Sequence, residues 1–164
     1  MREPDEARVP LLSILIPAAR IAEREIAEAL VPMNLAPAQF AIIDLLDRTG
    51  DLRPAAIARA LDVETSTITL NLKRAERDGL ISRMPDPDDT RSILISLSPD
   101  GRARVPAARL AMKTVEDRLT EGLSVNEKAA LKGAMLHFLN ERSSSAQGGR
   151  SGTRSGGKPG SQAR

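Results

Sequence analysis

The sequence predicts a mainly helical fold with one small β-hairpin, on three observations. Apolar side chains recur at helical spacing in six segments, and prolines or glycines stand at most of the segment ends, where they start and stop helices. Within this pattern, the stretch RMPDPDDTRSILISLS at residues 83–98 changes to a period of two. Ile93, Ile95 and Leu97 alternate with serines, with Leu94 as the one interruption, which is typical of a β-strand.

The first helix is expected from Leu11 to Leu30, after a polar and flexible segment of residues 1–10. Pro17 either kinks this helix or starts its regular part. The apolar residues lie on more than one side of the helix, which a lone surface helix would not tolerate. Residues 11–33 are therefore expected to pack against a partner.

Three shorter helices follow. Each is bounded by proline, glycine or a polar turn. They are predicted from Pro37 up to Gly50, from Pro54 to Leu61 and from Thr65 to Asp78, and residues 51–53 form a short connector or a stub of strand.

A hairpin is predicted after the fourth helix. Its strands are Leu80–Met84 and Arg91–Leu97, and the turn is Pro85–Thr90. A helix, a short turn, a second helix and a two-stranded hairpin is the order of a winged helix-turn-helix domain. We assign that domain to residues 34–98.

Two more helices are predicted within residues 99–142. Ser98 is a good N-cap for the fifth helix, and Ser124 with Glu127 forms a capping box before the sixth. The first, fifth and sixth helices carry more apolar surface than one small domain can bury. They are therefore expected to form the interface of a homodimer.

The last segment, residues 143–164, consists mainly of Ser, Gly, Arg and Gln. It is expected to be disordered, because it cannot bury enough apolar area to offset its ordering entropy. It holds four basic residues and no acid, whereas the rest of the chain has 20 basic and 22 acidic residues. The net charge of +2 thus comes from the tail, and nucleic-acid binding must be argued from where the charges lie.

The fourth helix, TSTITLNLKRAERDGL, separates two faces. Ile68, Leu72 and Ala75 share one of them. The opposite face fits the major groove of DNA, where hydroxyls meet base edges and cations meet phosphates or guanine. The alternative is an ordinary solvated helix face. The candidate DNA-contacting residues are Ser66, Thr67, Thr69, Leu70, Lys73, Arg74 and Arg77.

Residues 34–103 resemble the multiple antibiotic resistance regulator (MarR) family. The resemblance rests on Gln39-Phe40, on Thr67-Ile68-Thr69 followed by Glu76 and Gly79-Leu80, and on the motif Asp89-Thr90-Arg91. It implies a homodimeric transcriptional repressor, with two recognition helices about one DNA turn apart on a palindromic operator. It also implies a small organic effector between the dimer helices and the winged domain, and no other cofactor.

The resemblance places the aspartate and the arginine of the last motif at the wing tip. Arg91 would enter the DNA minor groove, and Asp89 would hold its guanidinium in place. A narrow minor groove concentrates negative potential and attracts arginine. The neighbouring Asp86 and Asp88 should repel phosphate unless they cap the turn or point away.

The chain departs from the family's pattern at three positions. Ala36 replaces the usual N-cap Thr or Ser of the second helix, and Glu64 is a poor N-cap for the fourth. Leu70 stands where the family often has an arginine. It either contacts a thymine methyl group or indicates that this helix binds DNA weakly.

The composition argues against an enzyme and against a membrane protein. There is no cysteine, and the single histidine, His137, lies one turn before Glu141, which is typical of a helix-surface contact. Phosphate-binding glycine loops and nucleophile motifs are absent from the sequence, so no catalytic residue or metal ligand is assigned. The apolar runs are too short to span a membrane, and a cytoplasmic protein is expected. The alternative function is a winged-helix protein-interaction module with weak or no specific DNA binding.

Overall fold

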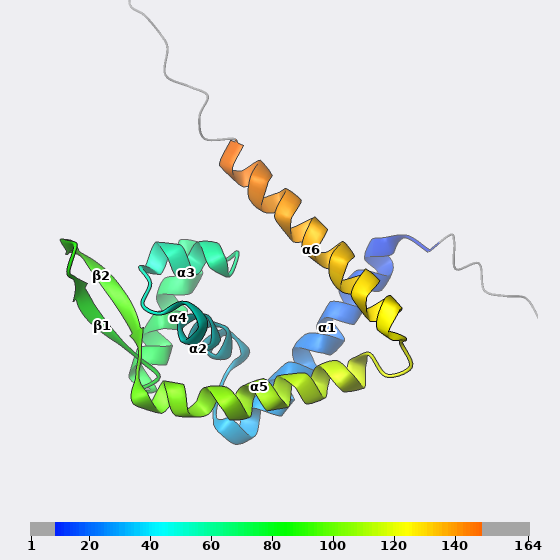
Figure 1. The fold of residues 1–164 in the computed structure, drawn as a ribbon, viewed down its shortest axis with the longest axis horizontal. Helices are drawn as coiled ribbons and strands as arrows, with labels where there is room; N and C mark the ends of the chain where they lie inside the picture. The colour runs from blue at the N-terminus through cyan, green and yellow to red at the C-terminus, as the bar shows by residue number, and fades with distance from the viewer. Residues whose placement is uncertain (1–8, 149–164) are drawn as a thin grey trace, which may run out of the picture. The chain divides into compact units, whose positions relative to one another are not determined.

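The computed structural model describes the backbone of residues 9–148 and the side chains of residues 9–140 (Figure 1). Helices and one hairpin make up this part of the chain. In chain order the elements are α1 (Leu11–Leu30), the 3-10 turn η2 (Val31–Met33), α2 (Pro37–Thr49), α3 (Pro54–Ala60), α4 (Thr65–Arg77), β1 (Ile81–Asp86), β2 (Asp89–Leu97), α5 (Pro99–Leu119) and α6 (Val125–Gly148).

These elements belong to two compact units. The first unit extends to Glu121, and the second begins at Gly122 and contains α6. Within the first unit, α1 packs against α5, and α2 packs against α5 and α4. The antiparallel hairpin of β1 and β2 lies beside α3 and α4 (Figure 1). The predicted fold class, mainly helical with a small hairpin, is confirmed.

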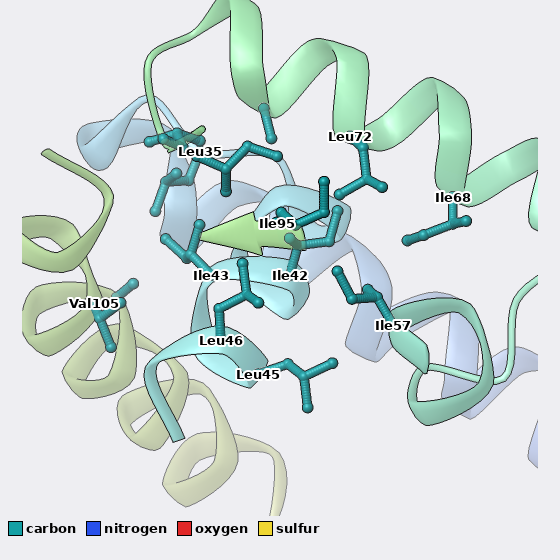
Figure 2. Close-up of a cluster of buried hydrophobic side chains, with 14 of the residues drawn as sticks. Leu35, Ile42, Ile43, Leu45, Leu46, Ile57, Ile68, Leu72, Ile95 and Val105 are labelled. Atoms are coloured by element: carbon teal, nitrogen blue, oxygen red, sulfur yellow. The ribbon is translucent and has the colours of Figure 1, made fainter. Parts of the chain in front are cut away.

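The core of the first unit is aliphatic. Side chains from α2, α3, α4, β2 and α5 converge in it, among them Ile43, Ile57, Leu72, Ile95 and Val105 (Figure 2). All five are at most 1% exposed. Burying a side chain of this size contributes roughly 1.5–3 kcal/mol, so this cluster fixes α4 and the hairpin to one scaffold.

Local signals in the sequence locate most helix ends. The hydroxyl of Ser98 accepts the Gly101 backbone N–H at 2.9 Å, which confirms the N-cap of α5. The Ser124 N–H donates to Glu127 Oε2 at 2.8 Å, so the capping box before α6 is also confirmed. Leu52 pairs with Ile95 in an isolated antiparallel bridge, so the connector before α3 is a stub of strand.

The hairpin differs from its prediction because its strands are longer. β1 runs to Asp86 and β2 begins at Asp89, with Pro85 inside β1 and a register irregularity at Pro85 and Asp86. A two-stranded hairpin has only edge strands, where a proline removes no inner ladder hydrogen bond. The predicted six-residue turn is therefore a tight turn at Pro87 and Asp88.

The sixth helix is longer than predicted. Its backbone stays helical to Gly148, whereas a disordered tail is predicted from Ser143. An existing helix extends at the gain of one hydrogen bond per residue, so serines and alanine at its end do not stop it. The predicted disorder of residues 149–164, like that of residues 1–8, concerns residues outside the described part of the chain.

Among the described residues, no single helix is long and apolar enough to cross a membrane. Within this part of the chain, one pair of helices, Leu11–Met33 and Pro37–Thr49, bent by 74°, meets that test by length and composition.

Candidate nucleic-acid interface

Helix α4 has one buried and one exposed face, as its sequence predicts. Ile68 and Leu72 are 1% exposed and belong to the core. Leu70 is 50% exposed although it is apolar. The seven candidate DNA-contacting residues are all exposed on α4: Ser66, Thr67, Thr69, Leu70, Lys73, Arg74 and Arg77. The structure therefore brings them together on one surface, which we call the α4 outer face.

Helix geometry limits what one of the hydroxyls can do. Thr69 Oγ1 donates to the Thr65 carbonyl oxygen at 2.8 Å. A hydroxyl has one hydrogen, so Thr69 offers only its acceptor lone pairs to an outside partner. Ser66 and Thr67 have no such bond among the described residues, and both their donor and acceptor functions remain available.

The three basic residues of the α4 outer face differ in their contacts. Within residues 9–140, no hydrogen bond or ion pair engages the side chain of Lys73 or Arg74. Arg77 Nε, by contrast, donates to Asp78 Oδ1 at 2.9 Å. This bond raises the pKa of Arg77 and lowers the pKa of Asp78. Lys73 and Arg74 are thus the cations of α4 that can meet a phosphate without breaking a contact.

The C-terminal end of α4 is fixed to the start of α2 by Gln39. This side chain is only 7% exposed, and its Nε2 donates to Asp78 Oδ2 at 2.7 Å. Its Oε1 accepts the Ala36 backbone N–H at 2.9 Å, which is one half of a capping box. The other half needs a side-chain oxygen at the N-cap, which Ala36 lacks. The sequence singles out Gln39 but gives no signal for its partner, because the two residues are 39 positions apart.

The wing holds Arg91 in solvent. Arg91 is exposed, and its guanidinium makes no hydrogen bond or ion pair within residues 9–140. Asp89 Oδ1 accepts the Arg91 backbone N–H at 3.2 Å, and Asp89 Oδ2 accepts the Ser92 hydroxyl at 2.6 Å. The bond from Ser92, followed by that from the Arg91 amide, lowers the pKa of Asp89.

The predicted role of Asp89 as a holder of the guanidinium is therefore wrong in this structure. An aspartate readily reaches the amide two residues ahead in a turn, and that bond competes with the longer reach to the side chain. The carboxylate fixes the backbone on which Arg91 stands. The side chain of Arg91 itself remains unpaired within the described residues.

Asp86 explains how the wing tolerates its acidity. It is 4% exposed, and its Oδ2 accepts from Arg53 Nε at 2.7 Å and from Arg53 Nη2 at 2.6 Å. Its Oδ1 accepts the Asp88 backbone N–H at 3.0 Å. The Asp88 amide first, and then Arg53, lowers the pKa of Asp86. Asp86 thus caps the turn. Its negative charge is neutralised by Arg53, so it should repel DNA phosphates little.

The Arg53–Asp86 pair also joins the wing to the helix-turn-helix. Arg53 is the N-cap residue of α3, held in an extended conformation before Pro54. A second link runs from β1 to α4, where Arg83 Nε donates to Glu76 Oε2 at 2.8 Å. Sequence reasoning missed Arg53, because no local pattern reports a partner 33 positions away.

Sequence reasoning also missed Arg59 on α3. It is exposed, and no hydrogen bond or ion pair engages its side chain within the described residues. Its only sequence signal is its place on the first helix of the helix-turn-helix, which crosses the DNA backbone in such domains.

Candidate metal ligands are not clustered in the described residues. In the part of the chain that the structure describes, no group of three or more His, Asp or Glu side chains could hold a metal ion. His137 lies in α6, and the side chain of Glu141, its predicted neighbour, is outside the described side chains.

These features define a winged-helix DNA-binding protein. They are a helix-turn-helix with a two-stranded wing, unpaired cations on its second helix and an unpaired arginine on the wing. Comparison with known proteins agrees. Residues 35–93 match the MarR family. The match covers the winged domain and agrees with the resemblance seen in the sequence. Curated relatives are named as transcriptional regulators rather than enzymes, as predicted.

Two relatives and one solved structure illustrate the match. The multiple antibiotic resistance protein MarR of Salmonella typhimurium is 26% identical over 132 residues, which cover 80% of this chain and 92% of that protein. The transcriptional repressor MdtR of Bacillus subtilis is 28% identical over 103 residues, covering 63% of this chain and 66% of that protein. The crystal structure of a mutant MarR from E. coli, complexed with operator DNA, has a TM-score of 0.75 at 23% identity and covers 84% of this chain and 99% of that one, which shows the shared fold.

Proposed function

We propose that this protein is a cytoplasmic homodimeric repressor that binds a palindromic operator and is released from it by a small-molecule effector. The observation that carries the proposal is the distribution of unpaired cations. In the described part of the winged domain, four of the seven arginines pair with a carboxylate, whereas Arg59, Arg74, Arg91 and the one lysine, Lys73, have no partner. All four lie on α3, α4 or the wing.

This distribution is what DNA binding requires. An unpaired cation releases counterions from DNA when it meets a phosphate, whereas a paired arginine must first give up its carboxylate. Lys73 and Arg74 would meet phosphates or guanine in the major groove, with Ser66 and Thr67 near base edges. Arg91 would enter the adjacent minor groove.

Apolar surface outside the winged domain supports the dimer. On α1, Leu11 is 70%, Leu12 is 64% and Ile14 is 54% exposed, and Leu110 on α5 is 68% exposed. Large apolar side chains are also exposed on α6, where Val125, Leu131, Leu136, Phe138 and Leu139 are each at least 48% exposed. A second copy of the chain would cover such surfaces and place two α4 helices on successive turns of DNA.

A cavity in the first unit supports the effector. It has a volume of about 550 Å³, within the usual range of roughly 300–1,000 Å³ for small-molecule sites. Its lining combines apolar and charged side chains of α1, α2 and α5 with Thr120, which follows α5. The helix residues are Ile26, Phe40, Asp44, Arg109, Met112, Lys113, Val115, Glu116 and Leu119. Since α2 also packs on α4, an effector in this cavity would act on the helix next to the recognition helix.

The experiment is selection of bound duplexes from random DNA with the full chain, followed by titration of the selected sequence. Two similar half-sites with centres about 10 base pairs apart are expected. Arg74→Ala should weaken binding and reduce the salt slope by about one. Arg102→Ala is the matched control, because Arg102 already contacts Asp47 at 3.4 Å and should leave the slope unchanged.

Two outcomes would contradict the proposal. One is a selection that enriches no sequence. The other is an equal effect of Arg74→Ala and Arg102→Ala on the salt slope, which would mean that the α4 outer face does not meet the DNA backbone. Light scattering on the same sample checks the dimer, which should have about twice the 17.6 kDa mass of the chain.

A further inference from the structure

The α4 outer face has an apolar side chain at its centre. Leu70 is 50% exposed, and its neighbours three and four positions away on the helix are Ser66, Thr67, Lys73 and Arg74. All four are polar and exposed. Leu70 does not contribute to the core, whose α4 members are Ile68, Leu72 and Ala75.

Two polar side chains of the α4 outer face have hydrogens that are already engaged within the protein. The hydroxyl hydrogen of Thr69 is used by the Thr65 carbonyl, and the guanidinium of Arg77 is held by Asp78. The centre of the face therefore offers an aliphatic contact, while the available donors lie one turn to either side of it.

In the major groove of DNA, the largest apolar group on a base edge is the C5 methyl of thymine. A leucine pressed against a thymine methyl buries apolar surface on both partners. Against guanine, cytosine or adenine it would cover donors or acceptors and leave them without a partner, which is unfavourable. The contact would therefore discriminate between bases without any hydrogen bond.

We propose that Leu70 is a specificity-determining residue that reads the methyl group of one thymine in each half-site of the operator. The inference rests on the proposed function, because it requires α4 to lie in the major groove. It makes Leu70 a base reader and accounts for an exposed leucine among polar neighbours.

The test removes the methyl group alone. In the selected operator, each thymine is replaced in turn by deoxyuridine, which keeps every hydrogen-bonding group of the base. For the wild-type chain, one position per half-site should lose about fourfold in affinity, the value of one buried methyl-sized group, and about fifteenfold when both half-sites are changed. Replacement at other positions should have little effect.

Two variants of the chain test whether Leu70 causes this loss of affinity. Leu70→Ala should bind the thymine and deoxyuridine operators equally at that position, because the shorter side chain no longer reaches the methyl group. Ser66→Ala is the matched control on the same face. It should lower the affinity for both operators by the same factor and keep the difference between them. Since Leu70 is half exposed, neither change is expected to unfold the protein.

The results separate the two proposals. If selection enriches no sequence, the proposed function fails and the inference falls with it. If an operator is found but no thymine is sensitive to loss of its methyl group, the inference alone is overturned. The same holds if Leu70→Ala keeps the full sensitivity, because another residue would then make the contact.

Discussion

Gly101→Ala tests how closely the wing and α5 must approach each other. Gly101 lies in the first turn of α5 and is buried. A Cβ atom at this position would overlap the carbonyl oxygen of Leu80 and lie 2.9 Å from Leu97 Cδ1. The Leu97 side chain can rotate away, but the Leu80 carbonyl belongs to the backbone and also accepts the Ser98 N–H at 3.1 Å. The clash can therefore be relieved only by moving α5 or the wing.

The expected cost follows from two opposing effects. Adding a methyl group to a well-packed site costs typically 1–3 kcal/mol, and a backbone neighbour puts this site at the upper end. Alanine is favoured over glycine in a helix by up to about 1 kcal/mol. The net loss in the free energy of unfolding should be roughly 2 kcal/mol, which lowers the melting temperature by about 4–8 °C for a chain of this size.

Urea unfolding followed by circular dichroism measures this change. Gly133→Ala is the control, because its Cβ would meet nothing within 4 Å and it also lies in a helix, α6. It should leave the midpoint unchanged or raise it. A Gly101→Ala protein that unfolds at the wild-type urea concentration would refute the close approach between α5 and Leu80.

Three predictions concern the wing. Arg91→Ala should weaken operator binding by roughly 1–3 kcal/mol in a titration and leave urea unfolding unchanged, since its guanidinium has no partner in the described residues; an unfolding shift would contradict this. Asp89→Ala should also weaken binding, because the turn under Arg91 loses two hydrogen bonds, although simple charge removal predicts tighter binding. Asp86→Asn should destabilise the protein at about pH 7, and the difference from wild type should shrink progressively as the pH falls below about 3.9. The lowered pKa of Asp86 stabilises the fold above the ordinary aspartate value of about 3.9, and that contribution is lost as the pH falls through the lowered value, so a pH-independent difference in urea unfolding would rule this out.

The fold was predictable where the signals are local. Pro37, Pro54 and Pro99 each start a helix, because proline suits the first helical turn. The alternation around Ile95 identifies a strand with one buried face, and Ile95 is indeed fully buried. Such features depend on a few neighbouring residues and can therefore be predicted from the local sequence.

The candidate site was predictable only as a set of exposed residues. Its internal contacts join residues far apart in sequence, such as Arg53 with Asp86 and Gln39 with Asp78. Several aspartates and arginines could satisfy each charge equally well by sequence, so tertiary packing decides the pairs. The error at Asp89 has a different, local cause, because the backbone amide of Arg91, only two positions away, donates to the carboxylate in place of the guanidinium.

The hydrogen bonds and ion pairs of the wing also decide which of its aspartates can repel DNA. Asp86 is neutralised by Arg53, and the carboxylate of Asp89 is occupied by the Arg91 amide and the Ser92 hydroxyl. Asp88 is different, because it is exposed and no hydrogen bond or ion pair engages its carboxylate in the described residues. Asp88→Asn should therefore tighten binding to all DNA by roughly two- to fivefold at low salt, and the gain should fade as salt screens exposed charges. Asp89→Ala removes the same formal charge one position away and should have the opposite effect. If both variants tightened binding equally in a salt titration, net charge alone would govern the wing, and the separate roles that the hydrogen bonds give to these two aspartates would be wrong.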